Sequence, residues 1–547
     1  MPTGGISRPG RGAFLGDAET PSAFREALET MKLDFIKNTK RNVVAGAISR
    51  GLALLLPFLN RSLFLWLMGP KYLGLNGLFT SILGMLSLAE LGFGAAVVCS
   101  MYKPIADDDR ELVCAYLNFY RRVYRWVGSA IFVIGLCLLP FLRKLVHGDL
   151  PPDVDLHILY LLHLVNTSAS YFLFAYRSAV INAHQRNYEL TNMNTVLSLL
   201  QYLSVFLILI LTRNYYLYVI TVVIFTGIRN VWVMRVAKRL FPYIEPRGEL
   251  EAERRRRVIA DVKSIFMHKI GAVISYSIDN VVLSAFLGLV AVASYGNYYY
   301  VYTAVAGIPA VVYSTMAGGF GNRIHTESRE ENFRLFMRVS RLVGIIIIWC
   351  AAMMMALYQP FIAIWTRHNP DLVQHRLTAI LMVAYFVVNQ SRQVLLTYKA
   401  AAAIWSADRW KPVVSGVVKL AFCLFFIHVL SGEYKLDGVI LSSIIGYLFI
   451  QIPWESHVMF TQFFDRDQAK VYWRHQALSV LIAAGIAAAT WAVIQLIPMD
   501  KAVGLAVKGI AAAAFSGGLV VLFFRRDLRE AAAKLLSRRR AAENGAH

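Results

Sequence analysis

The chain has 547 residues, of which 57% are hydrophobic and 16% are charged, and its formal net charge is +22. Soluble domains average about 45–50% apolar and about 25% charged residues, so this composition excludes an ordinary soluble protein. In a soluble protein the positive charge would indicate nucleic acid, whereas in a membrane protein Lys and Arg gather in cytoplasmic loops. We therefore expect no nucleic-acid partner, and we interpret the cluster Arg254–Arg257 as a topology determinant at the inner leaflet.

The N-terminal stretch, residues 1–40, contains Gly, Arg and Pro followed by a short charged segment. It lacks the apolar centre and the small-residue cleavage site of a signal peptide. We expect a cytoplasmic tail here, with the first membrane helix acting as the insertion signal.

The apolar residues gather into about fourteen runs of roughly 20–28 residues, the length that crosses a hydrocarbon core of about 30 Å. A faint internal repeat relates the seventh and eighth runs to the first and second. Aligning Gly69 with Gly288 pairs Asn60 with Asp279, Arg61 with Asn280, Asn76 with Asn297 after a small shift, and Phe93 with Phe320. The predicted fold is all-α: a polytopic membrane protein with about 14 transmembrane helices, in two pseudo-symmetric six-helix bundles plus two C-terminal helices.

This pattern divides the chain into six parts. In chain order we expect a cytoplasmic tail, the first six-helix bundle, a basic cytoplasmic connector, the second six-helix bundle, two additional transmembrane helices and a basic cytoplasmic tail, at residues 1–40, 41–237, 238–263, 264–462, 463–525 and 526–547.

One set of connections between the runs is several-fold richer in Lys and Arg than the other, and it includes Arg254–Arg257 and Arg538–Arg540. The positive-inside rule places this set in the cytoplasm, and both termini with it. We predict a bacterial cytoplasmic membrane protein whose outward loops, at most about 15 residues long, leave no room for a folded catalytic domain.

Several cations lie inside the apolar runs, where each costs about 2.5–3.5 kcal/mol and is by default a functional candidate. Arg50 and Arg61 are eleven residues apart, which returns them to nearly one helix face about 16 Å apart. Arg392 and Lys399 share a face of the tenth run, and Arg177 lies in the fourth. We predict that these five cations line a cavity, although snorkelling to an interface is the alternative for those near a helix end.

Carboxylates are fewer in these runs, so the predicted cavity attracts an anion. Arginine suits phosphate because its planar fork makes two hydrogen bonds at once, which makes a lipid diphosphate a natural cargo. Glu90 and Asp279, with the neighbouring Asn280, are candidates for ion pairing or for coupling to a proton or a sodium ion.

The sequence contains no nucleotide-binding GxxxxGK[ST] loop and no HExxH metal helix. Its five cysteines make no CxxC pair and indicate neither a disulfide framework nor a metal site. We expect no cofactor, no catalytic residues and no enzyme.

Several stretches resemble the polysaccharide-export branch of the multidrug/oligosaccharidyl-lipid/polysaccharide exporter superfamily. The most specific is LSLAELGFG at 86–94 followed by MYKPIADDD at 101–109. Others are the segment beginning at Gly69, NFYRRVYRWVG at 118–128, residues 171–183, IDNVVLSAFLG at 278–288, YGNYYYV at 295–301 and ADRWKP at 407–412.

The resemblance implies fourteen helices in two bundles and alternating access. It also implies export of a polyprenyl-diphosphate-linked oligosaccharide across the cytoplasmic membrane, alongside other polysaccharide-assembly proteins. By this analogy Arg50, Arg61, Glu90, Asp279 and Arg392 face a central cavity. The chain departs from the family at Ala401–Ala403, at Lys419 and in its long N-terminal tail, and these departures bear on the substrate.

Alternatives of other kinds stay open. A lipid II flippase would differ only in cargo, and an ion-coupled multidrug exporter would share the fold but favour an acidic cavity. A membrane polysaccharide polymerase or ligase usually needs a sizeable outward loop. A scramblase or a purely structural role would not require two similar halves.

Overall fold

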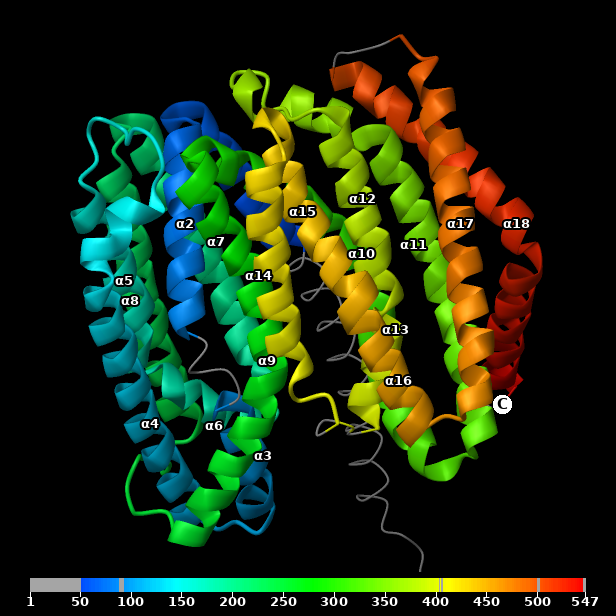
Figure 1. The fold of residues 1–547 in the computed structure, drawn as a ribbon. Helices are drawn as coiled ribbons and strands as arrows, with labels where there is room; N and C mark the ends of the chain where they lie inside the picture. The colour runs from blue at the N-terminus through cyan, green and yellow to red at the C-terminus, as the bar shows by residue number, and fades with distance from the viewer. Residues whose placement is uncertain (1–50, 88–92, 403, 405–406, 499–501, 545–547) are drawn as a thin grey trace, which may run out of the picture. The chain divides into compact units, whose positions relative to one another are not determined.

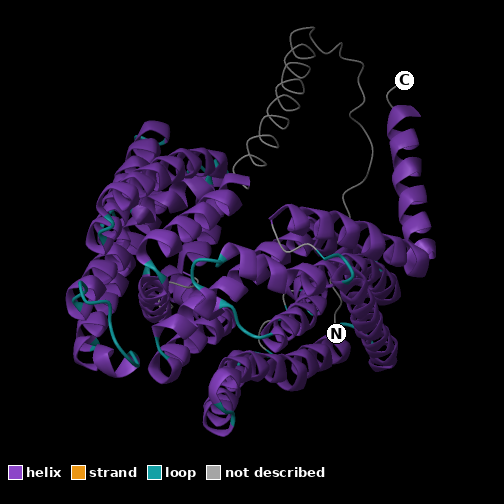
Figure 2. Cartoon of the chain, turned by 90° about the horizontal axis from the view of Figure 1, so that it is seen from above, coloured by secondary structure: helices purple, strands orange, loops and turns teal. Residues whose placement is uncertain are grey.

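The computed structural model describes residues 51–87, 93–402, 404, 407–498 and 502–544. These residues form helices joined by short connections, with no strand among them (Figure 2). Helices satisfy their own backbone hydrogen bonds, which a hydrocarbon core requires. In the described stretches nine helices are long and apolar enough to cross a membrane, or up to eleven when two bent pairs each count as one span. The all-α membrane fold is confirmed, and the count of fourteen spans stays a prediction.

The contacts reported below all lie within the unit Leu56–His547. The helices up to the predicted connector are the span Gly51–Met68, α2 (Pro70–Leu86), α3 (Phe93–Ala106), α4 (Arg110–Cys137), α5 (Leu156–Phe172), α6 (Ser178–Ala183), α7 (Asn187–Thr212) and α8 (Tyr215–Leu240). Short 3₁₀ turns follow α4 at Leu139–Leu145 and precede α6 at Ala175–Arg177.

The rest of the chain begins with three long helices (Figure 1). These and the following elements are α9 (Ala252–Leu287), α10 (Leu289–Thr326), α11 (Arg329–Trp365), a 3₁₀ turn (Pro370–Leu372), α12 (Arg376–Ser391), α13 (Gln393–Ala401), α14 (Lys411–Val429), a 3₁₀ turn (Gly432–Tyr434), α15 (Lys435–Gly446), a π-helical turn (Tyr447–Gln451), α16 (Ile452–Gln462), α17 (Arg466–Gln495) and α18 (Ala502–Asn544).

Local sequence signals set several helix starts. Asp155 accepts hydrogen bonds from the backbone N–H groups of His157 and Ile158 at the start of α5. Ser328 and Glu331 form a capping box at the start of α11. Each cap satisfies backbone N–H groups that have no partner within the helix.

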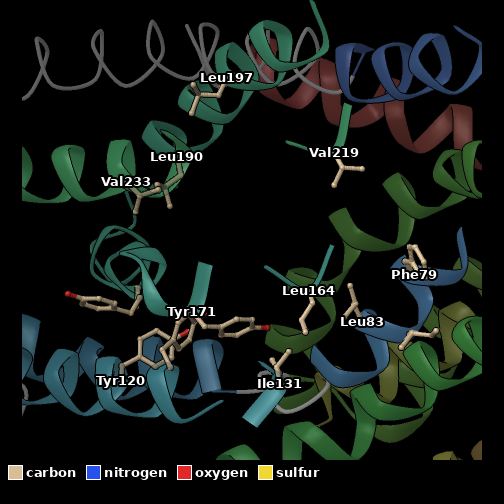
Figure 3. Packing of buried hydrophobic residues seen from close by; sticks show 14 of the residues in the cluster. Phe79, Leu83, Tyr120, Ile131, Leu164, Tyr171, Leu190, Leu197, Val219 and Val233 are labelled. Atoms are coloured by element: carbon tan, nitrogen blue, oxygen red, sulfur yellow. The ribbon is translucent and has the colours of Figure 1, made fainter. Parts of the chain in front are cut away.

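Two large hydrophobic cores organise these helices. The first gathers residues from the first membrane helix to α8, and Figure 3 shows part of it, including Phe79 and Leu164. The second gathers residues from the end of α9 to the start of α17. The long helix α9 contributes Val258 to the first core and Leu283 to the second, so it belongs to both.

Two smaller apolar clusters attach α17 and α18 to α11. One of them joins Ile348 of α11 to Ile486 of α17 and Val520 of α18. The last two helices therefore pack against the outer side of a helix that also contributes to the second core. The residue boundaries of the six predicted parts stay a prediction, and residues 1–40 lie outside the described part of the chain.

Helices α2 and α10 cross closely and link the two cores. Gly69, which precedes α2, has φ 92° and ψ 177°, and Gly288, which precedes α10, has φ 88° and ψ −178°. Glycine adopts such positive φ values without strain. The two glycines were aligned in the sequence repeat, and their matching backbone conformations support that alignment.

The contacts across this crossing are also reciprocal. Arg61, before Gly69, reaches α10, where it donates to Asn297. Asn280, aligned with Arg61, reaches α2, where its Nδ2 donates to the Ser81 hydroxyl at 2.7 Å. Each half thus sends a polar side chain to the first helix after the other half's glycine.

The close approach of α2 to α10 depends on Gly74. A Cβ atom at this position would lie 2.0 Å from the carbonyl oxygen of Leu289, a backbone atom that cannot turn aside. We expect Gly74→Ala to reduce the free energy of unfolding by about 1–3 kcal/mol, as overpacking usually does. Thermal unfolding of the purified protein measures this loss.

Gly227 of α8 provides the matched control, because a Cβ there would meet no atom within 4 Å. Gly227→Ala should raise stability by about 0.5–1 kcal/mol, since alanine favours a helix interior. Equal unfolding temperatures for the two variants would contradict the close packing of α2 on α10.

Candidate functional site

The first predicted site residue that the structure describes is Arg61. Its Nε donates to Oδ1 of Asn297 at 2.6 Å, and its Nη2 donates to the carbonyl oxygen of Ala293 at 3.3 Å. Beside it Asn60 donates to the Tyr218 hydroxyl at 3.1 Å. The hydroxyls of Tyr218 and Tyr300 lie within electrostatic range of the Arg61 guanidinium. We call this group the Arg61 cluster: Asn60, Arg61, Tyr218, Asn297 and Tyr300.

An apolar groove adjoins the Arg61 cluster. It has a volume of about 370 Å³ and is lined by apolar and aromatic side chains of the first membrane helix, α10, α11 and α18. Phe58, one turn before Arg61, lines the groove and stacks on Tyr300 with ring centroids 6.3 Å apart. Because Tyr300 belongs to both features, a polar, cationic site and an apolar site meet at this ring.

Arg229 of α8 is a further arginine within a membrane span, and it was not among the predicted site residues. Its Nη2 donates to Oε1 of Gln201 in α7 at 3.3 Å. The available signal was an arginine inside an apolar run, the criterion applied to the other cations.

Asp279 lies in α9 and pairs with Lys419 of α14. The Lys419 ammonium is 2.8 Å from Oδ1 and 2.9 Å from Oδ2, and the Tyr295 hydroxyl donates to Oδ2 at 2.6 Å. Both charged side chains are buried. Asp279 therefore forms a buried ion pair that joins α9 to α14. Its coupling to a proton or a sodium ion stays a prediction.

Arg392 and Lys399 belong to a buried charge network. We define the charge network as Arg392, Lys399, Asp408, Lys411 and Glu455. The guanidinium of Arg392 makes a two-pronged pair with Glu455, its Nε donating to Oε2 at 3.0 Å. Lys411 bridges the two carboxylates, at 2.5 Å from Glu455 and 2.9 Å from Asp408, and Lys399 donates to Asp408.

The network holds three cations and two carboxylates, and Asp408 and Glu455 are both 0% exposed. Such charges persist in a protein interior only when they are paired and hydrogen-bonded. Asp408 precedes α14, Lys411 is the first residue of that helix, and both side chains are buried. The network joins α13, α14 and α16 around Arg392.

Arg177 lies apart from these groups. It is buried at the end of the 3₁₀ turn before α6, and its Nη2 donates to Oε2 of Glu245 at 2.6 Å. Glu245 lies in the predicted basic connector, which also docks through Asn118 of α4, whose Nδ2 donates to the carbonyl oxygen of Gly248 at 2.7 Å. Arg177 thus fastens the start of the connector to the first core.

Two predicted site residues, Arg50 and Glu90, lie outside the described residues. Of the others, Arg61 lies at the α10 contact, Arg177 at the connector, and Arg392 and Lys399 in the charge network. Asn280 spans the α2–α9 contact through Ser81. The cationic cavity that would unite the five cations stays a prediction.

The pKa of Asp408 gives a pH-dependent test of the charge network. Burial raises the pKa of this carboxyl, yet the charges of Lys411 and Lys399 outweigh burial and hold the pKa below its usual value of 3.8. A depressed pKa contributes stability above the unfolded-state pKa, and that stability is lost as the pH falls through the folded-state pKa.

We therefore expect wild type to be more stable than Asp408→Asn by a constant margin above about pH 4, and the margin to shrink on acidification below that value. Thermal unfolding of both proteins over a pH series measures the margin. Asp467→Asn is the control, because this side chain is exposed and its nearest cation is 4.0 Å away. A margin that stays constant down to pH 2 would contradict an ionised, paired Asp408.

No group of three His, Cys, Asp or Glu side chains among the described residues could hold a metal ion. The described part of the chain therefore offers no metal centre for chemistry. Its buried polar groups form ion pairs and hydrogen bonds between helices, an arrangement that can bind a charged cargo or fix the helices.

No family model and no curated protein sequence matches this chain. Solved structures do match. A lipid II flippase, MurJ, in an inward closed conformation has a TM-score of 0.64 and 12% identity, covering 88% of this chain and 98% of the flippase. A multidrug resistance MATE transporter of the MOP superfamily, facing inward, has a TM-score of 0.56 and 14% identity, covering 77% and 96%. A MATE transporter of Vibrio cholerae has a TM-score of 0.50 and 13% identity, covering 79% and 95%.

This chain has the fold of MOP-superfamily transporters. At these identities the likeness shows the fold alone, and it covers nearly the whole of each matched transporter. The resemblance seen in the sequence motifs is thus confirmed at the level of the superfamily fold, and the polysaccharide-export branch stays a prediction.

Proposed function

We propose that this protein is a flippase that exports a polyprenyl-diphosphate-linked oligosaccharide across the cytoplasmic membrane by alternating access, for surface polysaccharide synthesis. The observation that carries the proposal is the contact between the Arg61 cluster and the apolar groove. A lipid-linked glycan has an anionic diphosphate joined to a long apolar chain. One site of each kind, meeting at Tyr300, suits such a cargo.

The headgroup end of the proposed site is cationic and rich in hydrogen-bond donors. Arg61 supplies a guanidinium group, which can donate two parallel hydrogen bonds to phosphate oxygens. Asn60 and Tyr218 add neutral donors that suit sugar hydroxyls. We assign the first contact with the diphosphate to Arg61. Arg50, Arg177, Arg392 and Lys399 remain proposed contributors to a cavity in another state of the transport cycle.

The chain end of the site is the apolar groove. Phe58, Met354 and Phe361 line it together with Leu505 of α18. A groove without charged side chains would hold an isoprenoid chain by burying apolar area, at about 25 cal/mol per Å². A small hydrophilic cargo would gain nothing from this groove, which favours a lipid-linked cargo.

The comparisons with solved structures support a lipid-linked cargo but do not identify which one. The MurJ structure is that of a lipid II flippase, and its TM-score and coverage exceed those of the MATE transporters described above. A lipid II flippase is therefore the alternative that differs only in cargo. A multidrug exporter is the second alternative, and the cationic Arg61 cluster disfavours the cationic cargo of such exporters.

The remaining parts of the proposal concern the cell. We place the protein in the bacterial cytoplasmic membrane with both termini in the cytoplasm, where it would work with polysaccharide-assembly proteins. A proton or a sodium ion would drive transport at Glu90 or Asp279. Deleting the gene should block surface glycan display while lipid-linked units accumulate on the cytoplasmic side. Normal display in the deletion strain would contradict the proposed flippase activity.

The test at residue level is Arg61→Ala in that deletion strain. Losing charge-assisted hydrogen bonds of about 1.5–3 kcal/mol should lower cargo affinity about 10- to 100-fold. Surface glycan display, normalised to protein in the membrane, measures the loss. Arg61→Lys keeps the charge but not the fork and should restore display in part.

Lys71→Ala is the matched control, because this exposed lysine lies at the start of α2, near Arg61 in sequence. It should complement fully. Full complementation by Arg61→Ala as well would show that Arg61 serves the α10 contact rather than the cargo.

A further inference from the structure

A second pocket adjoins the second core, which contributes Ala379 to its lining. Its volume is about 350 Å³, and its walls come from α11, α12, α17 and α18. It lies at the end of the bundle where α12 and α18 begin and where α17 ends (Figure 1). Its lining includes no residue of the Arg61 cluster or of the charge network, and it shares Leu505 with the apolar groove.

Two cations line this pocket. Lys508 of α18 is 7% exposed and lies within a membrane span. A buried lysine in such a span is costly, which makes it a functional candidate. Arg376 is the first residue of α12, so it stands at the positive end of that helix's dipole. The two side chains approach one pocket from different helices. An anion between them would be favoured by both charges and by the helix end.

The other walls indicate the depth and the kind of ligand. Trp491 lies one turn before the end of α17, and tryptophan gathers at the membrane–water interface. Ile364, Ile380 and Leu505 supply apolar surface beside the two cations. Phosphate groups of membrane lipids also lie at the membrane–water interface, with their acyl chains running toward the membrane centre.

We propose that this pocket binds the phosphate of a membrane phospholipid between Arg376 and Lys508, with an acyl chain against Ile364, Ile380 and Leu505. The ligand would bridge α12 to α18 and so fasten the last two helices to the rest of the unit. With the predicted topology the lipid belongs to the outer leaflet. This site does not depend on the proposed flippase activity.

The experiment uses the full chain, purified in detergent and incubated with phosphatidylglycerol, and counts bound lipids by native mass spectrometry. Wild type should retain phosphatidylglycerol but not diacylglycerol of the same chains, which lacks the phosphate. Arg376→Gln with Lys508→Gln should lower retention about 100-fold or more, since each cation makes charge-assisted hydrogen bonds. Arg367→Gln, an exposed cation between α11 and α12, should retain the lipid fully.

Arg376→Gln alone keeps the test decisive if the double variant does not fold, because this exposed side chain can be changed without disturbing a core. Equal retention by wild type and Arg376→Gln would overturn the proposal. Two competition arms identify the source of the phosphate. Displacement by millimolar inorganic phosphate would indicate a free-anion site, and preferential displacement by a polyprenyl diphosphate would indicate a cargo site. Either result would overturn the assignment to a phospholipid.

Discussion

Replacing Glu455 by glutamine should destabilise the second core by about 3–5 kcal/mol, because it leaves buried cations without a balancing charge. Glu455 is 0% exposed and pairs with both Arg392 and Lys411. Glutamine keeps the size of the side chain but cannot neutralise either partner. The remaining carboxylate, Asp408, would face three cations alone. We expect a large fall in unfolding temperature and in the amount of protein that reaches the membrane.

The control for this prediction is Glu433→Gln. Glu433 is an exposed carboxylate in the 3₁₀ turn before α15, and its loss should change stability little. Combining Glu455→Gln with Lys411→Met removes one charge of each sign and should recover part of the loss. A double-mutant cycle from these proteins gives the coupling energy. A coupling energy near zero would contradict the bridging role of Lys411.

The charge network also shows what the sequence could and could not predict. Arg392 was singled out because an arginine inside an apolar run is costly. Its partner Glu455 lies 63 positions further along the chain, and the Asp279–Lys419 pair spans 140. Single-sequence reasoning sees the cost of a buried charge but not the distant group that compensates it. An excess of cations therefore suggested a cationic cavity, and the structure pairs Arg177, Arg392 and Lys399 with carboxylates.

The fold was more predictable than the site, because hydrophobic length directly reports membrane spans. The repeat signal at Gly69 and Gly288 located the two helix starts that share one backbone conformation. Asp408 and Lys411 were not among the predicted site residues, because only charges inside the apolar runs were treated as functional candidates. The structure buries both side chains where α13 and α14 meet α16.

Lys419→Met should destabilise the protein by about 3–5 kcal/mol, for the same physical reason with the opposite sign of charge. Asp279 would then be a buried carboxylate that has lost its cation but still accepts the hydrogen bond from the Tyr295 hydroxyl. Asp279→Asn combined with Lys419→Met removes both charges at once. Neutral replacements of a buried ion pair are often tolerated, so the double variant should regain most of the lost stability. Lys435→Met, an exposed lysine at the start of α15, is the control.

The double variant separates a structural pair from a coupling site. If Asp279 takes up a proton or a sodium ion during transport, the stable double variant should still fail to restore glycan display in the deletion strain. If the pair only fastens α9 to α14, the same protein should transport normally. Display and unfolding temperature measured on this variant therefore distinguish the two roles, because it removes both ionisable groups but should keep most of the stability. Failure of both readouts together would instead show that the neutral pair cannot fill this part of the second core.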